Sequence, residues 1–138
     1  MKVKDFVRVV KLKNTKDLVA LEAGEGCLYI DESGVNSLCH NGDAMHFLAY
    51  VEFCTGKLRG NHYHRERVEN LCVLKGTLDA KFYLHTNPSE VLEIKLVQGD
   101  VVTVQAGCIH SYHASEPASV MEFAQQKFNP QDIYKLHD

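Results

Sequence analysis

A segment with two histidines and a glutamate between two glycines constrains this chain more than any other feature. Its spacing is G-x5-H-x-H-x4-E-x6-G, formed by Gly56, His62, His64, Glu69 and Gly76. Side chains two residues apart on a β-strand project to the same side, so His62 and His64 face one way and a hairpin loop returns Glu69 beside them. Two imidazoles and a carboxylate suit a divalent first-row metal, whereas an unpaired buried carboxylate would have to protonate. The spacing therefore predicts a metal site.

A second glycine-bounded segment supplies a fourth candidate ligand. Gly99, Gln105, Gly107 and His110 follow the spacing G-x5-Q-x-G-x2-H, so a turn precedes a single histidine at the start of an apolar run. Together the two segments resemble the signature motifs of the cupin superfamily. That resemblance implies a jelly-roll β-barrel in which two histidines, a glutamate and a third histidine hold one divalent transition metal.

Position by position, the resemblance names the metal ligands as His62, His64, Glu69 and His110. Zinc, iron, manganese and nickel all remain open as the ion. The second motif departs from the family at Gln105, where proline is usual, and at Ala114, where asparagine is frequent. Neither departure removes a ligand, although a proline would have fixed φ in the turn before His110. The alternative is an empty barrel whose histidines contact substrate directly.

The expected fold is all-β, a single cupin jelly-roll domain with one or two short helical turns. A chain of 138 residues with 45% hydrophobic residues can fill one core and leaves no room for a second domain. We expect amino-terminal strands over residues 1–45, the motif-bearing barrel over 46–127 and a tail over 128–138. Runs between turn residues predict strands at Phe6–Leu12, Gly26–Ile30, His46–Cys54, Asn61–His64, Glu69–Leu74, Thr77–His85, Glu90–Leu96, Val101–Val104, Ile109–Ala114 and Ser119–Phe128.

Two local features complete the expected secondary structure. The segment His85–Ser89 is a turn cluster, so the strands before and after it are predicted to form a hairpin. Only Thr15–Ala23 and Pro130–Leu136 have a composition that favours a helical turn or two. In the cupin family, amino-terminal strands often pair across a dimer. That resemblance and the apolar run Val101–Val104 lead us to expect a homodimer.

Charge and cysteine content narrow the environment and the partners. A formal charge of −3 and a pI near 6.2 give no basic footprint for nucleic acid or an anionic membrane. The amino terminus lacks the apolar core of a secretory signal, and no run approaches the length of a membrane span. Five scattered cysteines without a C-x-x-C pair argue for a reducing compartment. We therefore expect a cytoplasmic protein that binds neither nucleic acid nor membrane.

The surroundings of the motif suggest a substrate class. The segment Arg59–His64, together with Glu69 and the following Val73–Gly76, resembles cupins that act on nucleotide-linked sugars. The ending Phe128–Tyr134 resembles the close of the same group. The resemblance implies an epimerase or isomerase acting on a nucleotide-sugar or a related keto-sugar. Such chemistry needs a base, an acid and an electrophile for the enolate oxygen, and the metal would be the electrophile.

Several residues are candidates for substrate binding and proton transfer. If Ile109–Ala114 is a strand, Tyr112 shares a face with His110 and is the first candidate for catalysis. Arg59 is the preferred phosphate ligand within a basic cluster that also contains Lys57, Arg65 and Arg67, because an arginine fork suits a diphosphate. On the preceding strand, the alternating residues His46, Tyr50 and Glu52 are further candidates for the cavity lining.

Two other functions remain open at this point. An iron-dependent dioxygenase acting on a small organic molecule would use the same ligand set, and redox-inert zinc would exclude it. A non-catalytic ligand-binding or sensing barrel is the third possibility, because fold alone does not give function. Elemental analysis separates the first two, and a ligand screen separates the third.

Overall fold

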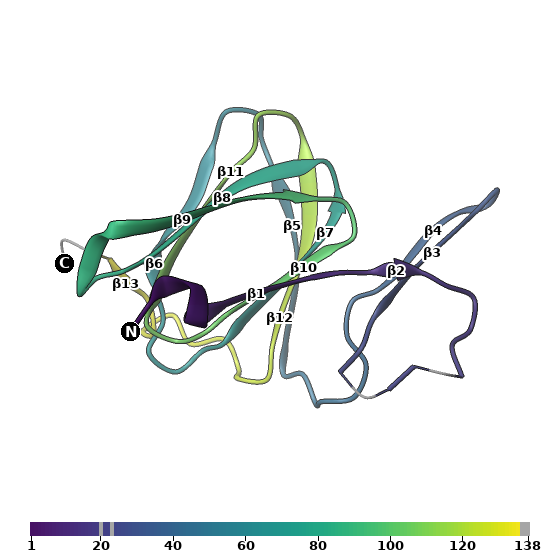
Figure 1. Cartoon of the computed structure of the whole chain (residues 1–138), viewed down its shortest axis with the longest axis horizontal. Coiled ribbons are helices and arrows are strands. Elements are labelled where there is room, and N and C mark those ends of the chain that lie inside the picture. Colours follow the sequence, from purple (N-terminus) through teal and green to yellow (C-terminus); the bar gives the residue numbers. More distant parts are fainter. Residues whose placement is uncertain (20, 23, 136–138) are drawn as a thin grey trace.

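The protein folds into β-sheets, as the sequence predicted. The structure, a computed structural model, describes residues 1–19, 21–22 and 24–135. Two five-stranded sheets face each other and form a barrel, and a three-stranded sheet stands beside them (Figure 1). The only helix among the described residues is the short 3₁₀ helix η1 (Val3–Phe6). The predicted all-β class is therefore confirmed.

The two barrel sheets interleave strands from distant parts of the sequence. In the first sheet the order is β1 (Val7–Lys11), β10 (Asp100–Val104), β7 (Glu69–Lys75), β12 (Ala118–Ala124), β5 (Phe47–Phe53). In the second sheet the order is β13 (Tyr134–Lys135), β6 (Leu58–Tyr63), β11 (Cys108–His113), β8 (Thr77–Leu84), β9 (Asn87–Val97). All pairings within these two sheets are antiparallel. Each strand therefore presents alternate side chains to the space between the sheets.

The core fills the space between the two sheets with aliphatic and aromatic side chains. Leu71 and Val73 on β7, Phe82 on β8 and Val120 on β12 are fully buried there. Burial of this apolar surface is the main favourable contribution to folding. Of the motif residues, Glu69 begins β7, His62 lies on β6, His110 lies on β11, and His64 directly follows β6.

The amino-terminal segment supplies one barrel strand and a separate small sheet. β1 pairs with β10, whereas β2 (Lys13–Asn14), β3 (Cys27–Asp31) and β4 (Gly34–Leu38) form the third sheet. Apolar side chains from this part of the chain cover the outer face of the first barrel sheet: Leu12, Leu28, Cys39 and Met45 pack with Cys72, Val101 and Phe123. The outward apolar face of Val101–Val104 is thus covered within this chain. The homodimer stays a prediction.

The β8–β9 hairpin confirms one local prediction and corrects its turn. The two strands pair from Thr77↔Val97 to Leu84↔Asn87, so only His85 and Thr86 form the turn. Asn87 and Pro88, which the sequence pattern placed in the turn, belong to β9. A proline is tolerated there because β9 is an edge strand, where a missing N–H donor costs no ladder hydrogen bond.

The helical predictions for Thr15–Ala23 and Pro130–Leu136 are wrong for the described residues of both segments. No helix occurs at residues 15–19 and 21–22, while residues 20 and 23 lie outside the described chain. In the second segment, Pro130 and Gln131 form a turn and β13 follows, and residue 136 lies outside the description. Asp132 explains this, because its carboxylate binds backbone N–H groups of another loop instead of capping a helix. No helix in the described chain is long and apolar enough to cross a membrane.

Candidate active site inside the barrel

Three histidines converge between the two barrel sheets. His62 lies on β6 directly opposite His110 on β11, and His64 follows β6 by one residue. Their ring centroids are 5.0 Å apart for His62 and His64, 4.9 Å for His62 and His110, and 5.3 Å for His64 and His110. One nitrogen from each ring lies within 4.8 Å of the other two. The sequence spacing therefore brings all three imidazoles to one point.

Backbone carbonyl groups orient two of these rings. His64 Nδ1 lies 2.6 Å from the carbonyl oxygen of Asp132, and His110 Nδ1 lies 3.2 Å from that of Cys108. A neutral imidazole that donates through Nδ1 leaves its Nε2 lone pair free. The Nε2 atoms of His64 and His110 are buried and have no hydrogen-bond partner in the described chain. In its neutral form, each of these two rings therefore presents an unsatisfied acceptor to the interior.

Glu69 lies against one side of this histidine cluster. It begins β7, and its carboxylate oxygens lie 3.7 Å from His64 Nε2 and 3.1 Å from His110 Nε2. Burial raises the pKa of Glu69, but His110, His64 and Arg67 outweigh burial and lower that pKa to about 2. The carboxylate is therefore ionised. It faces the Nε2 atoms of His64 and His110, but it lies outside the group of ligand atoms within 4.8 Å of one another, which contains only the three histidines among the described residues.

The histidines differ in their proton affinity. Burial, and then the neighbouring His110 and His64, lower the pKa of His62 to about 4. Burial also lowers the pKa of His110. Burial acts in the same direction on His64, but its contacts with Glu69 and the Asp132 carbonyl group outweigh it and raise that pKa. His62 and His110 are therefore neutral near pH 7, which is the form that binds a metal.

Tyr112 lies on the same face of β11 as His110. The two rings are 5.9 Å apart, and the Tyr112 hydroxyl donates a hydrogen bond of 3.4 Å to Glu69 Oε2. Complete burial, and then the charge of Glu69, raise the pKa of Tyr112 well above its ordinary value. The phenol therefore stays protonated and holds its proton inside the site.

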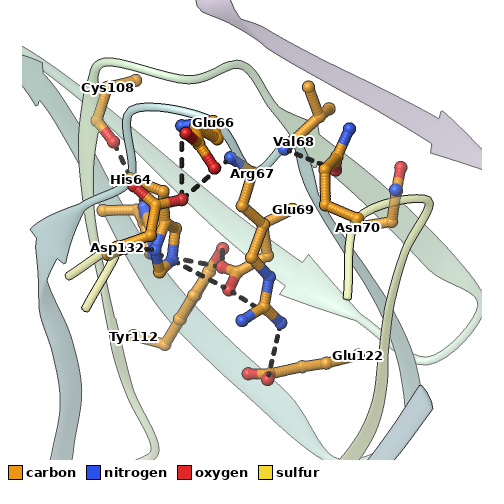
Figure 2. A network of polar contacts seen from close by, with 12 residues as sticks. His64, Glu66, Arg67, Val68, Glu69, Asn70, Cys108, Tyr112, Glu122 and Asp132 are labelled. Carbon is orange, nitrogen blue, oxygen red and sulfur yellow. Dashed lines mark hydrogen bonds and ion pairs between the residues drawn. The ribbon is translucent and has the colours of Figure 1, made fainter. Parts of the chain in front are cut away.

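Arg67 and Glu122 belong to the site, although the sequence analysis named Arg67 only as a member of the basic cluster and did not name Glu122. Figure 2 shows the Arg67 guanidinium between two carboxylates, with Nη2 lying 3.9 Å from Glu69 Oε1 and 3.8 Å from Glu122 Oε2. Arg67 is buried and also lies 4.0 Å from the centre of the Phe47 ring. Arg67 therefore lies inside the cavity as a buried residue. The sequence feature that could have indicated Glu122 is its position as the lone carboxylate among apolar residues in β12.

The other two arginines of the basic cluster point to different places. Arg59 is exposed, lies 5.8 Å from the centre of the Phe53 ring and lines the mouth of the cavity that contains the histidines. Arg65 instead stacks 4.1 Å from the centre of the Tyr134 ring and does not line that cavity. The structure therefore supports a rim position for Arg59 alone.

The tail between β12 and β13 holds the loop after the histidine strand. The Asp132 carboxylate accepts hydrogen bonds from the backbone N–H groups of Arg65, Glu66 and Arg67, at 2.8, 3.2 and 3.1 Å. The same residue supplies the carbonyl group that orients His64. Figure 2 shows Asp132 between this loop and the His64 ring. The tail thus fixes one histidine from outside the motif.

The site forms a cavity of about 160 Å³. Apolar side chains of Phe47, Phe128 and Ile133 line it together with the polar residues, and the rings of Phe47 and Phe128 stack with centroids 5.8 Å apart. His46, Tyr50 and Glu52 do not line it. These residues are exposed, because the inward alternation of β5 runs through Phe47, Ala49, Val51 and Phe53.

The fold and the histidine constellation define a cupin. The cupin family model matches residues 41–135, so the chain belongs to the cupin family. No curated protein matches the sequence.

Solved structures with the same fold include two sugar-modifying enzymes and one protein of capsular polysaccharide assembly. The sugar 3,4-ketoisomerase QdtA from Thermoanaerobacterium thermosaccharolyticum, in complex with TDP, superposes with a TM-score of 0.70 at 15% identity, covering 94% of this chain and 87% of that one. The dTDP-4-dehydrorhamnose 3,5-epimerase from Sulfolobus tokodaii gives 0.65 at 16% identity, covering 77% and 70%. The capsular polysaccharide assembling protein CapF from Staphylococcus aureus gives 0.61 at 20% identity, covering 80% of this chain and 32% of that one. At these identities the likeness establishes the fold alone.

Proposed function

We propose that this cupin is an isomerase or epimerase acting on a keto-sugar carried by a nucleotide. One observation carries the proposal: a single cavity contains a buried proton donor, Tyr112, beside a cluster of unsatisfied histidine nitrogens, with the exposed cation Arg59 at its mouth. The sugar isomerase and epimerase that share the fold support the same class of reaction. The reaction would proceed by enolisation next to a carbonyl group.

The residues present fit a divalent metal. The Nε2 atoms of His64 and His110 are buried acceptors that face the ionised Glu69, and no protein donor satisfies either nitrogen in the described chain. A cation would satisfy this set, so His62, His64, Glu69 and His110 would hold it, and zinc, iron, manganese or nickel would accept these donors. When bound, such an ion supplies Lewis acidity for the oxygen of the substrate carbonyl group.

The other residues of the cavity have separate tasks in this reaction. Tyr112 holds its proton at Oη within the cavity and can deliver it to the enolate formed from the substrate. Phe47, Phe128 and Ile133 make the entrance apolar and limit access of water. Arg59 projects where the nucleotide diphosphate of a substrate would leave the cavity, and its guanidinium can bind two phosphate oxygens.

Proton exchange tests the proposed reaction without knowledge of the product. Incubation of the purified protein with UDP- or dTDP-linked keto-sugars in deuterated water should place deuterium on the carbon beside the keto group, because enolisation breaks that C–H bond. Mass spectrometry measures the incorporation. If no such keto-sugar exchanges while iron-loaded protein consumes oxygen, a dioxygenase replaces this function. Ligand binding without any exchange would instead indicate a sensing barrel.

The role of Arg59 has a matched control in Arg65. Arg59→Ala should raise KM about tenfold or more with little loss of kcat, because a remote phosphate contact contributes mostly uniform binding. Arg65→Ala removes the same charge from the loop that follows the strand of Arg59, but outside the cavity, and should leave both constants close to wild type. Equal effects of the two substitutions would contradict a diphosphate site at Arg59.

A further inference from the structure

Enolisation needs a base inside the cavity, and the proposed function leaves this base unassigned. Tyr112 carries its proton and donates it toward Glu69. Glu69 faces His64 and His110, so both of its oxygens are engaged within the histidine cluster. One nitrogen of each histidine lies within 4.8 Å of the other two, so these nitrogens are directed toward one another. Another carboxylate remains among the cavity residues, that of Glu122 on β12.

Glu122 is the charged residue on an otherwise apolar inward face. It lies between Val120 and Ala124 along the alternation of β12, and both neighbours are fully buried. Its side chain retains 21% of its accessible surface and lines the same cavity as Tyr112. A carboxylate at such a position is costly unless it is paired or has a chemical task.

The pairing of Glu122 leaves one of its oxygens available. Oε2 lies 3.8 Å from Arg67 Nη2, whereas Oε1 makes no hydrogen bond or ion pair with any residue that the structure describes. Arg67 is itself held from the other side by Glu69 and by the Phe47 ring, so the guanidinium fixes Glu122 without enclosing it. Figure 2 shows this order, with Glu122 on the far side of the Arg67 guanidinium from His64.

We infer that Glu122 is the catalytic base of the proposed sugar isomerase or epimerase, an assignment that rests on the proposed function. Its free oxygen removes the proton from the carbon beside the keto group. The C–H bond breaks, its electron pair forms the C=C bond of the enolate, and the carbonyl π pair moves onto the substrate oxygen. The proton stays on the Glu122 carboxyl group, and reprotonation of carbon by a cavity acid completes the reaction without any change in oxidation state.

The charges around Glu122 favour this task. The groups that act on it are Glu69 on β7, Arg67 in the preceding loop, Arg59 on β6 and His64, with the Tyr112 phenol lining the same cavity from β11. Burial, and then the negative charge of Glu69, raise the pKa of Glu122 to about 7. A base of that strength is matched to proton abstraction near neutral pH.

The test compares deuterium exchange in wild-type protein, Glu122→Gln and Glu93→Gln. The glutamine keeps the shape of the side chain and cannot take the proton, so exchange should fall about 10²- to 10⁴-fold, the usual contribution of one acid–base group. Metal content and the affinity for the nucleotide-sugar should stay unchanged, which a structural role would not predict. Glu93 is exposed and pairs with Lys81 outside the cavity, so its variant should exchange like wild type.

The outcomes separate this inference from the function on which it rests. Wild-type exchange together with a Glu122→Gln rate within about threefold of it would overturn the base while the function stands. A wild type without exchange on any keto-sugar would overturn the function and the base with it. If Glu122→Gln does not fold, Glu122→Asp keeps the charge beside Arg67 but withdraws the oxygen, and a loss of about tenfold or more in kcat at unchanged KM is expected. An unaffected kcat in Glu122→Asp would then overturn the assignment.

Discussion

The two halves of the barrel interior follow the same strand alternation but bury opposite kinds of side chain, apolar in one half and polar or charged in the other. Where β8, β9, β1 and β10 meet, the interior is apolar and closed, with Phe82, Leu96 and Val102 fully buried. Where β6, β11, β7 and β12 meet, buried imidazoles and carboxylates face one another, and two ring nitrogens lack a partner in the described chain. The apolar half contributes stability to the fold. That stability offsets the cost of burying imidazoles and carboxylates close together in the second half.

The largest expected effect comes from the apolar half. Phe82→Ala should lower the free energy of unfolding by about 3–5 kcal/mol, because a fully buried ring is replaced by a cavity. Urea denaturation followed by fluorescence or circular dichroism measures this change. A loss below about 1 kcal/mol would show that this half is not the stable one.

A smaller effect is expected at Gly60, where β6 and β11, neighbouring strands of one sheet, approach each other closely. Its φ is +93°, and a Cβ there would lie 2.7 Å from the His110 carbonyl oxygen, so β6 and β11 could not keep their distance. Gly60→Ala should cost about 1–3 kcal/mol of stability and also weaken metal binding by moving His62 away from His110.

Gly56 provides the matched control for this substitution. It also has a positive φ, +78°, but a Cβ there meets nothing within 4 Å. Gly56→Ala should therefore cost stability by backbone strain alone and leave metal affinity unchanged. Equal losses of metal affinity in both variants would argue against a role for the close approach of β6 to β11.

The smallest expected effect concerns the pH dependence of the metal-free protein. The pKa of His62 falls from its ordinary value of 6.5 to about 4 on folding, first because of burial. The folded state thus binds this proton less readily, so its contribution to stability is present above pH 6.5 and is lost as the pH falls toward 4. Denaturation with a chelator present, compared between wild type and His62→Gln, should show a shallower loss in the variant. An identical slope would contradict the shift.

The sequence predicted the site best where the chain is locally regular. The two-residue spacing of His62 and His64 indicated that both side chains point the same way, and the resemblance to the cupin motifs added His110 to them. Arg67 could not be placed this way, because it lies in a loop without periodicity and its buried position depends on Asp132 binding the backbone around it. The sequence shows Glu122 as a carboxylate within an apolar strand. That its side chain points inward could be known only from the register of β12 against β7.

Errors in the fold prediction have a similar cause. The sequence-based prediction missed the two-residue strands β2 and β13 and the strand β4, which lacks a regular apolar alternation, and each of them pairs with a neighbouring strand. The predicted strand Ser119–Phe128 ends at Ala124, after which the tail turns across the site. Tertiary pairing, rather than local propensity, decides such segments.

The most direct test of the account is the metal content of purified protein after loading with zinc, iron, manganese or nickel. Elemental analysis of wild type should find one ion per chain, and excess metal should raise the unfolding free energy by about 2.7 kcal/mol at a hundredfold excess over Kd. His64→Ala should lose most of the metal and this stabilisation, whereas His113→Ala, outside the cluster on the same strand as His110, should keep both. Stoichiometric metal retained in His64→Ala, or a wild type that binds none of these ions, would contradict the metal centre.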